Sequence, residues 1–170
     1  MPELRRNKML SVLQDSKYVT GSELARIFNV TRQVIVKDVA VLRAAGHDII
    51  ATPKGYFLQQ ASESTGLRRV IAIKHDASDI HRELEIIVDC GGKVLDVIVE
   101  HPVYGEIKAN LMIDSRLDLE LFIEKTKKYN ARPLSSLTAG VHLHTIEAKS
   151  EEVWHKISEK LSAEGFLLND

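Results

Sequence analysis

The spacing of apolar residues changes along this chain, from a purely helical period in the first third to alternating strand and helix patterns in the rest. In the first third, apolar residues recur three or four positions apart in three stretches, which predicts three amphipathic helices. These helices are expected at residues 3–14, 20–28 and 32–45. Thr20 and Glu23 have the spacing of a capping box before the second helix, and Thr31 suits the cap of the third. Three short helices with a tight second turn indicate a helix-turn-helix.

Two short apolar runs follow the third helix and predict a β-hairpin. Residues 49–52 and 56–58 flank Pro53-Lys54-Gly55, where proline and glycine take positions that a four-residue turn favours. A hairpin directly after a helix-turn-helix is the wing of a winged helix. Residues 59–65 are small and polar and have no apolar period, which is typical of a linker. We therefore expect a winged helix-turn-helix domain, a linker and a second domain, at residues 1–60, 61–67 and 68–170.

The pattern after the linker alternates between strands and helices. The predicted elements are a strand at 67–75, a helix at 79–90, strands at 93–100 and 105–113, a helix at 116–129, a strand at 137–147 and a helix at 150–164. This order is that of the split βαβ, or ferredoxin-like, fold (βαββαβ) with an added C-terminal helix, and the whole chain is predicted to be α+β. In that fold the first and last strands are antiparallel neighbours, so the end of the first lies near the beginning of the last.

Four residues of the second domain form a candidate metal site. His142 and His144 lie two positions apart on the last predicted strand, so both imidazoles project from one face. His75 ends the first strand, and Glu83 lies on the helix that follows. Three imidazoles and one carboxylate can bind one divalent transition metal ion per chain, such as nickel, zinc or iron. The alternative for each histidine is a hydrogen-bonded structural role.

Charge divides the chain at the same place as the apolar pattern. Residues 1–58 contain nine Lys or Arg against five Asp or Glu, whereas residues 59–170 contain fourteen against nineteen. A basic small domain joined to an acidic larger one favours a polyanion-binding module with a regulatory partner. The single cysteine, Cys90, cannot form an intramolecular disulfide, and no apolar stretch approaches the roughly 20 residues that span a bilayer. We expect a cytoplasmic protein that does not enter a membrane.

The basic residues of the winged helix predict a surface for double-stranded DNA. Thr31, Arg32 and Gln33 open the recognition helix, where Arg suits guanine and Gln suits adenine in the major groove. Lys37, one turn further along, is better placed for a phosphate. Further candidates for contacts with the DNA backbone are Arg5, Arg6, Lys8, Arg43, Lys54 and Tyr56. The alternative is a protein-interaction module with a solvated basic face.

These features together resemble one bacterial family. The N-terminal segment looks like a biotin-repressor-type winged helix, and residues from about 68 onward resemble the three-histidine domain. The motifs that carry this likeness are His75, His101-Pro102-Val103-Tyr104-Gly105 and Gly140-Val141-His142-Leu143-His144. The whole chain is similar to the niacin-responsive transcriptional repressors.

This resemblance implies a homodimer that binds operator DNA and represses genes for NAD biosynthesis and niacin uptake, with nicotinic acid as corepressor. It also implies a divalent transition metal held by His75, Glu83, His142 and His144. His101 and Tyr104 are candidates for contact with the effector. Two other functions remain open: a regulator for which the metal itself is the signal, and a metal-dependent hydrolase. A hydrolase lacks a visible general base because Glu83 is occupied as a ligand, so we do not expect an enzyme.

Overall fold

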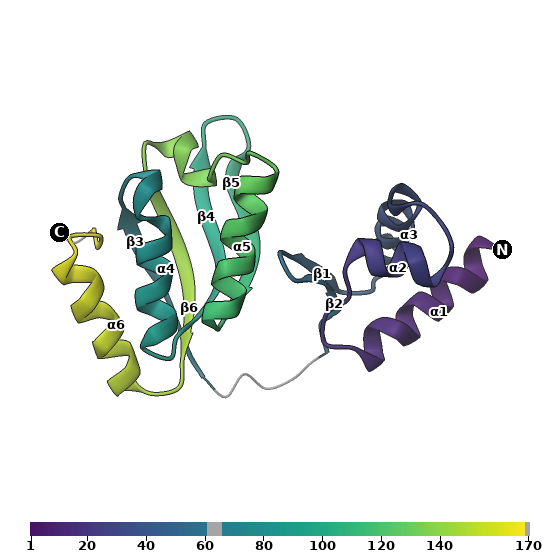
Figure 1. Ribbon diagram of the computed structural model, residues 1–170, viewed down its shortest axis with the longest axis horizontal. Helices are drawn as coiled ribbons and strands as arrows, with labels where there is room; N and C mark the ends of the chain where they lie inside the picture. The colour runs from purple at the N-terminus through teal and green to yellow at the C-terminus, as the bar shows by residue number, and fades with distance from the viewer. Residues whose placement is uncertain (61–65, 169–170) are drawn as a thin grey trace. The chain divides into compact units, whose positions relative to one another are not determined.

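The structure, a computed structural model, describes residues 1–60 and 66–168. It divides into two compact units, Met1–Glu63 and Ser64–Asp170 (Figure 1). The predicted α+β class is confirmed, with a helix-turn-helix unit followed by a unit built on one sheet. Most of the expected linker, residues 61–65, lies outside the described residues, and Leu67 already pairs with Ala148 in the sheet. No helix in the described part of the chain is both long and apolar enough to cross a membrane.

The first unit is a winged helix. Its elements are α1 (Pro2–Asp15), α2 (Gly21–Ile27), α3 (Arg32–Ala44), β1 (Ile49–Thr52) and β2 (Gly55–Leu58). The capping box of Thr20 and Glu23 is present, and the Thr31 hydroxyl caps α3 by accepting the Val34 N–H at 3.3 Å. The core is formed by buried side chains from the three helices and the first strand, including Met9, Leu13, Leu24, Ile35, Val39 and Ile49. The predicted helices and hairpin of this unit therefore form close to their expected bounds.

The wing turns where the sequence predicts it. Thr52 and Gly55 are paired across the hairpin, with Pro53 and Lys54 between them. Gly55 has a φ of +124°, and a Cβ there would lie 2.7 Å from the backbone of Val19. Only glycine fits this position without displacing its neighbour.

The second unit keeps the predicted order of elements. They are β3 (Leu67–Lys74), the 3₁₀ turn η1 (Ala77–Asp79), α4 (Ile80–Asp89), β4 (Lys93–His101), β5 (Gly105–Ile113), α5 (Arg116–Lys128), the 3₁₀ turn η2 (Leu134–Thr138), β6 (Val141–Ala148) and α6 (Glu151–Ala163). Helices α6, α4 and α5 lie side by side over one face of the sheet (Figure 1). Apolar residues between these layers, among them Ile73, Ile87, Ile146 and Ile157, form the core.

The lateral order of the strands differs from the ferredoxin-like arrangement. The strand order in the sheet is β3-β6-β4-β5, and every pair is antiparallel. The second and last strands of the unit, β4 and β6, therefore occupy the centre of the sheet. In a ferredoxin-like sheet the two central strands are the first and the third. Strand β4 is mostly buried, while the edge strands β3 and β5 each expose several residues. Element order alone does not determine which strand is central. The expected contact between the first and last strands is nevertheless present, because β3 pairs with β6 along its whole length.

The last strand begins later than its pattern predicts. Residues 137 and 138 belong to η2, and Ala139 then takes a left-handed conformation with a φ of 50°. Gly140 follows with a φ of +90°, and a Cβ on it would collide with the His75 carbonyl oxygen. The tight turn therefore lies directly against the end of β3 where β6 begins.

Candidate metal centre and nucleic-acid interface

The four predicted metal ligands come together on the helix-covered face of the sheet. His142 and His144 lie on β6 opposite Ile73 and Ile71 of β3. His75 follows the last residue of β3, and Glu83 lies in the first turn of α4. The side chains of all four predicted ligands are buried. Residues 67 positions apart in the sequence are thus neighbours because the first and last strands pair.

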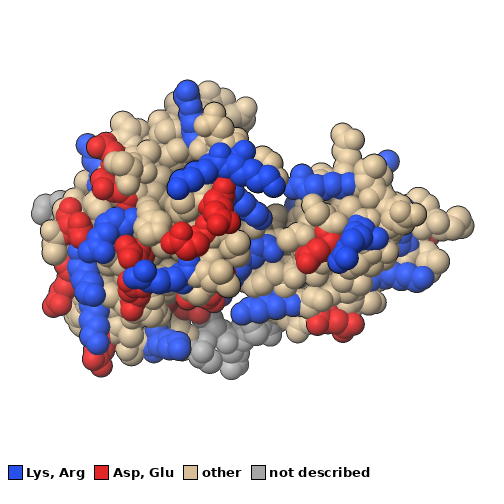
Figure 2. Space-filling view, viewed as in Figure 1, with Lys and Arg blue, Asp and Glu red and all other residues tan. Residues whose placement is uncertain are grey.

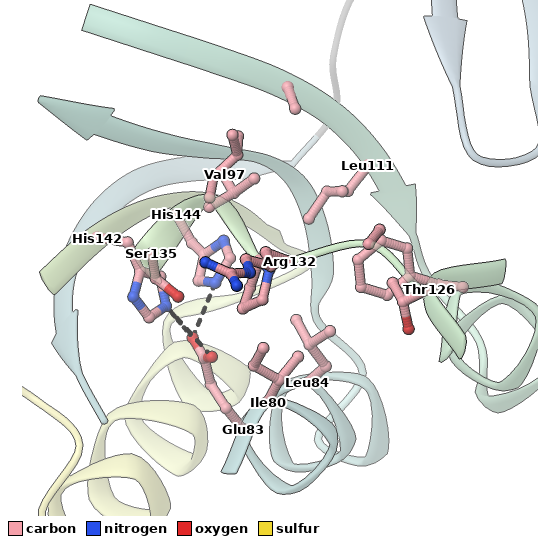
Figure 3. Close-up of a pocket in the computed structure, with 15 residues that line it drawn as sticks. Ile80, Glu83, Leu84, Val97, Leu111, Thr126, Arg132, Ser135, His142 and His144 are labelled. Atoms are coloured by element: carbon pink, nitrogen blue, oxygen red, sulfur yellow. Dashed lines mark hydrogen bonds and ion pairs between the residues drawn. The ribbon is translucent and has the colours of Figure 1, made fainter. Parts of the chain in front are cut away.

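Glu83 is the centre of this cluster. Its carboxylate contacts His75 Nε2 directly, lies 3.3 Å through both oxygens from His142 Nε2, and lies 2.8 Å through Oε1 from His144 Nε2. Ligand atoms of His75, Glu83 and His142 all lie within 4.8 Å of one another, and His144 joins this group through Glu83. Figure 3 shows the imidazoles of His142 and His144 directed at the carboxylate. Three ring nitrogens and a carboxylate therefore converge on one small volume.

The second nitrogen of each imidazole determines how the ring can act. In all three rings, Nδ1 lies within hydrogen-bond distance of a backbone carbonyl oxygen. The acceptors are Asp76, Gly140 and Asp96, at 2.7, 2.9 and 2.7 Å from His75, His142 and His144 respectively. A carbonyl only accepts, so Nδ1 carries the proton and the Nε2 of a neutral ring is a bare lone pair facing Glu83. Metal-binding histidines are commonly oriented by such a bond from the other ring nitrogen.

Glu83 and the imidazoles change one another's affinity for protons. Burial alone would raise the pKa of Glu83, but the charge of His144 and hydrogen bonds from the three rings hold that pKa well below its usual range. Burial likewise disfavours the charged forms of His75 and His144, yet the carboxylate of Glu83 raises the pKa of both rings above the usual value. The carboxylate stays ionised, and the site attracts positive charge.

An apolar cavity of about 190 Å³ adjoins the cluster. Glu83, His142 and His144 form one part of its wall, and Figure 3 shows the other residues around it. These come from α4, β4, β5, α5, the segment that leads into η2, and η2 itself, and include Leu84, Val97, Leu111, Phe122, Arg132 and Ser135. A small ligand in this cavity can reach the cluster without crossing the core.

The two residues predicted to contact an effector lie elsewhere. Nδ1 of His101 accepts the backbone N–H groups of Val103 and Tyr104, so His101 stabilises the turn between β4 and β5. His101 also borders a surface groove that reaches His142. Tyr104 is 77% exposed and lines neither the cavity nor this groove.

Sequence reasoning does not single out the cavity residues Phe122, Arg132 and Ser135. Phe122 has the spacing of an ordinary core residue on its helix, and Ser135 lies in a polar connection that predicts only a loop. An arginine before a proline, Arg132-Pro133, also predicts a loop and no contact. The cavity arises from the packing of several separate segments, and no local pattern in the sequence signals it.

In the winged helix, the exposed residues of α3 form the candidate DNA surface. Arg32, Gln33 and Lys37 are all exposed, whereas Ile35 and Val39 on the opposite side are buried. Thr31 is exposed as well, and its hydroxyl is used as the helix cap. The first turn of α3 therefore presents an arginine and a glutamine side chain to a ligand.

Two of the predicted phosphate contacts have partners within the unit. Arg5 makes a two-pronged contact with the buried carboxylate of Asp38, at 2.6 and 3.2 Å, and Arg6 lies 3.6 Å from the same group. These contacts join α1 to α3 and compensate the buried charge. Arg5 and Arg6 therefore have a structural role whether or not they approach DNA.

The wing residues differ in exposure and contact. Lys54 lies at the turn with its ammonium 4.4 Å from the centre of the Tyr18 ring, and Tyr56 packs partly against the core. Figure 2 shows Lys and Arg side chains over the N-terminal unit with little acidic surface among them, while both signs alternate over the second unit. Lys54 is thus partly buried beside an aromatic ring at the turn, and Tyr56 mainly contributes to packing.

Comparison with known proteins places both units in described families. A 3H domain model matches residues 68–170, and an HTH domain model matches residues 5–57. The chain is 42% identical to the probable transcription repressor NiaR of Thermotoga maritima and 41% identical to the transcription repressor NadR of Bacillus subtilis. Each alignment covers 98% of this chain and 94% of the relative.

The functions of these relatives distinguish between the two classes left open by the sequence, a transcription regulator and a hydrolase. They are repressors, so the predicted regulator is confirmed and the hydrolase finds no support. The basic winged helix is accordingly a DNA-binding module and not only a protein-interaction module. The chain belongs to the family of helix-turn-helix transcription repressors that carry a 3H domain.

Proposed function

We propose that this protein represses genes for NAD biosynthesis and niacin uptake in the cytoplasm, with nicotinic acid as its corepressor. A homodimer binds double-stranded operator DNA through its two winged helices. Each chain holds one divalent transition metal ion, with nickel, zinc and iron as the candidates. The ligands of this ion are His75, Glu83, His142 and His144.

The proposal of a metal rests on the orientation of the three imidazoles. Each Nδ1 is committed to a backbone carbonyl, so a neutral ring has no proton to offer Glu83 through Nε2. Without a metal ion, a ring can face the carboxylate favourably only when it is protonated, and the raised pKa values of His75 and His144 agree with such protons. A neutral ring instead directs a lone pair at a carboxylate. A divalent ion can take the place of these protons and be bound by all four groups, and the donor set fits its chemistry.

Nicotinic acid fits the cavity beside this site. When bound, the ion supplies a Lewis acid that accepts ligands beyond four protein donors, and nicotinate offers both a pyridine nitrogen and a carboxylate. The apolar walls suit the faces of the ring. Nicotinamide lacks the negative charge, so we expect it to bind at least about tenfold more weakly.

The winged helix supplies the DNA-binding part of the mechanism. Arg32 and Gln33 contact base edges, and Lys37 and Lys54 contact phosphates. In a dimer of helix-turn-helix proteins, the spacing of two recognition helices must match two half-sites about one helical turn apart. Nicotinate acts as corepressor if it binds the dimer arrangement with this spacing more tightly than the alternative arrangement.

Fluorescence anisotropy on the upstream DNA of the protein's own gene tests the proposal, with nicotinate, nicotinamide and metal varied separately. We expect tight operator binding only when both nicotinate and metal are present. Metal alone giving full binding would favour the metal sensor, for which the four-ligand cluster is already sufficient. DNA binding that responds to neither compound would contradict both functions.

A further inference from the structure

We infer that Arg132 is the residue that selects a carboxylate in the cavity of the second unit, and that the ligand class is a flat aromatic acid of one ring. This inference deepens the proposed function and rests on it for the identity of the ligand. Arg132 is a residue that no pattern in the sequence connects with a ligand.

Arg132 differs from the other arginines of its unit in having no acidic partner. Each of the other four forms an ion pair with a carboxylate. Those pairs are Arg68 with Glu147, Arg69 with Glu151, Arg82 with Glu164, and Arg116 with Asp89. Among the described residues, no hydrogen bond or ion pair involves the guanidinium of Arg132. A free guanidinium in an acidic domain is available for an anion from outside.

Arg132 borders the cavity. It lines the wall together with Ser135, and it is the one Lys or Arg among the described lining residues. In Figure 3 Arg132 lies on the side of the cavity where Ser135, His142 and His144 gather, while Leu111 and Thr126 lie on the other. A planar guanidinium can bind both oxygens of a carboxylate at once, which a point charge cannot do.

The negative charge of Glu83 does not oppose an anionic ligand here. Three imidazoles surround its carboxylate, and any cation they hold adds positive charge. With a divalent ion bound, the cluster and Arg132 therefore present two positive regions to the same cavity. A ligand with a carboxylate and a second donor atom can satisfy both.

The rest of the cavity sets the size and shape of the ligand. Phe122, Leu111, Leu84 and Val97 provide apolar walls that suit the faces of an aromatic ring. A volume of about 190 Å³ is below the range of about 300–1,000 Å³ that holds drug-sized ligands. One ring with one small substituent fits, whereas a nucleotide or dinucleotide does not.

A second hollow adjoins the cavity near Arg132, whose neighbours Ala131 and Pro133 line both. This hollow between α4 and α5 also shares Ile80 and Phe122 with the cavity wall. Arg132 itself is exposed, in the connection between α5 and η2. The guanidinium is therefore accessible to an acid from solvent.

Isothermal titration calorimetry on the metal-loaded full chain tests this assignment with three ligands. Nicotinate has a carboxylate and a ring nitrogen, benzoate has only the carboxylate, and nicotinamide has the ring nitrogen without the carboxylate. The variants are Arg132→Gln and Arg132→Lys. Arg68→Gln is the matched control because it removes an arginine of the same unit away from the cavity.

We expect Arg132→Gln to weaken nicotinate and benzoate about tenfold or more while nicotinamide changes less than about twofold. Arg132→Lys should recover part of the loss, and Arg68→Gln should bind like the parent. Equal losses for nicotinate and nicotinamide, or no loss for nicotinate, would overturn the role of Arg132. In the second case nicotinate binding itself would stand, so the proposed function would survive.

The opposite failure is also distinguishable. If the parent protein binds benzoate and loses it in Arg132→Gln but does not bind nicotinate, the role of Arg132 stands and nicotinic acid is the wrong effector. If the parent binds neither carboxylate, both the inference and the proposed effector are wrong.

Discussion

The winged helix and the 3H domain place their polar residues in opposite locations. In the winged helix the core is apolar apart from Asp38, and the residues expected to bind DNA lie on the surface of α3 and at the wing. The 3H domain, by contrast, buries several polar side chains. They are His75, Glu83, Asp96, Ser135, His142 and His144.

This difference shows how each unit reveals its function. Burying a polar or charged group is costly unless other groups compensate it. In the His and Glu cluster the rings and the carboxylate compensate one another, and it is the convergence of four metal-binding groups that favours a metal site. A basic patch on a small helical domain costs little, and many such patches are only solvated surface. The DNA-binding role of the first unit consequently depends more on its relatives than on its own geometry.

Removing two ligands of the cluster should cause the largest change of those predicted, the loss of the bound metal ion. We expect the parent protein to contain about one divalent ion per chain, and His142→Ala with His144→Ala to lose nearly all of it, because two of four donors are gone. Elemental analysis of purified protein measures this directly. His155→Ala on α6 is the control and should keep its metal. Full occupancy in the double variant would show that the buried cluster is structural, which would break the contrast between the two units.

Lowering the pH should weaken metal binding strongly. The raised pKa values of His75 and His144 mean that both rings in the metal-free protein keep a second proton to a higher pH than an ordinary histidine. A metal ion must displace those protons, whereas Glu83, with its lowered pKa, stays ionised. Between about pH 8 and 6 we expect the apparent affinity to fall by up to about tenfold per pH unit for each proton released. Calorimetry in buffers of different ionisation enthalpy counts those protons, and an affinity that is constant over this range would contradict the predicted competition.

The turn before β6 should be sensitive to a single methyl group. In Gly140→Ala the new Cβ would collide with the His75 carbonyl oxygen, on a backbone whose φ is +90°. The left-handed conformation alone costs about 1–2 kcal/mol for a residue with a Cβ, and the clash adds to it. Gly105→Ala is a matched control, because its φ is +71° and no atom lies within 4 Å of the new Cβ. Denaturant unfolding should show a larger loss for Gly140→Ala, accompanied by weaker metal binding. Equal losses for the two variants would mean that the contact with His75 is unimportant.

The two units also differ in how far the sequence predicts them. Caps such as Thr20 and Thr31 and the turn at Pro53 are local signals, so the elements of the winged helix follow from short stretches. The His and Glu cluster is predicted because strand spacing and one pairing of strands are enough to join its parts. The strand order of the sheet and the cavity around Phe122 depend on packing between distant segments. Neither has a local signature, which is why the lateral strand order departs from the ferredoxin-like one and why no sequence pattern points to Arg132.

The recognition helix should govern sequence preference more than affinity. Replacing Arg32 and Gln33 together by Ala should remove about 1–3 kcal/mol of discrimination between operator and unrelated DNA, because these exposed side chains are the ones expected to reach base edges. Anisotropy titrations on both DNAs measure the difference. Arg5→Ala is a useful contrast: it removes the two hydrogen bonds from Arg5 to the buried Asp38 and should lower stability more than it changes preference. Unchanged operator preference in the double variant would exclude α3 as the reading helix.

Replacing Lys54 at the wing should cause the smallest change of those predicted, a loss of DNA affinity that is similar for all DNA sequences. Its ammonium lies beside the Tyr18 ring at the tip of the hairpin, where we expect it to approach a phosphate and not a base edge. Lys54→Ala should therefore weaken operator and unrelated DNA by similar factors, and should reduce the slope of log affinity against log salt by about one unit. Lys149→Ala, which removes an exposed lysine of the second unit, serves as the control and should leave the slope unchanged. If Lys54→Ala lost affinity for operator DNA alone, the wing would contribute to sequence recognition. Both α3 and the wing, and not α3 alone, would then determine the DNA specificity of the first unit.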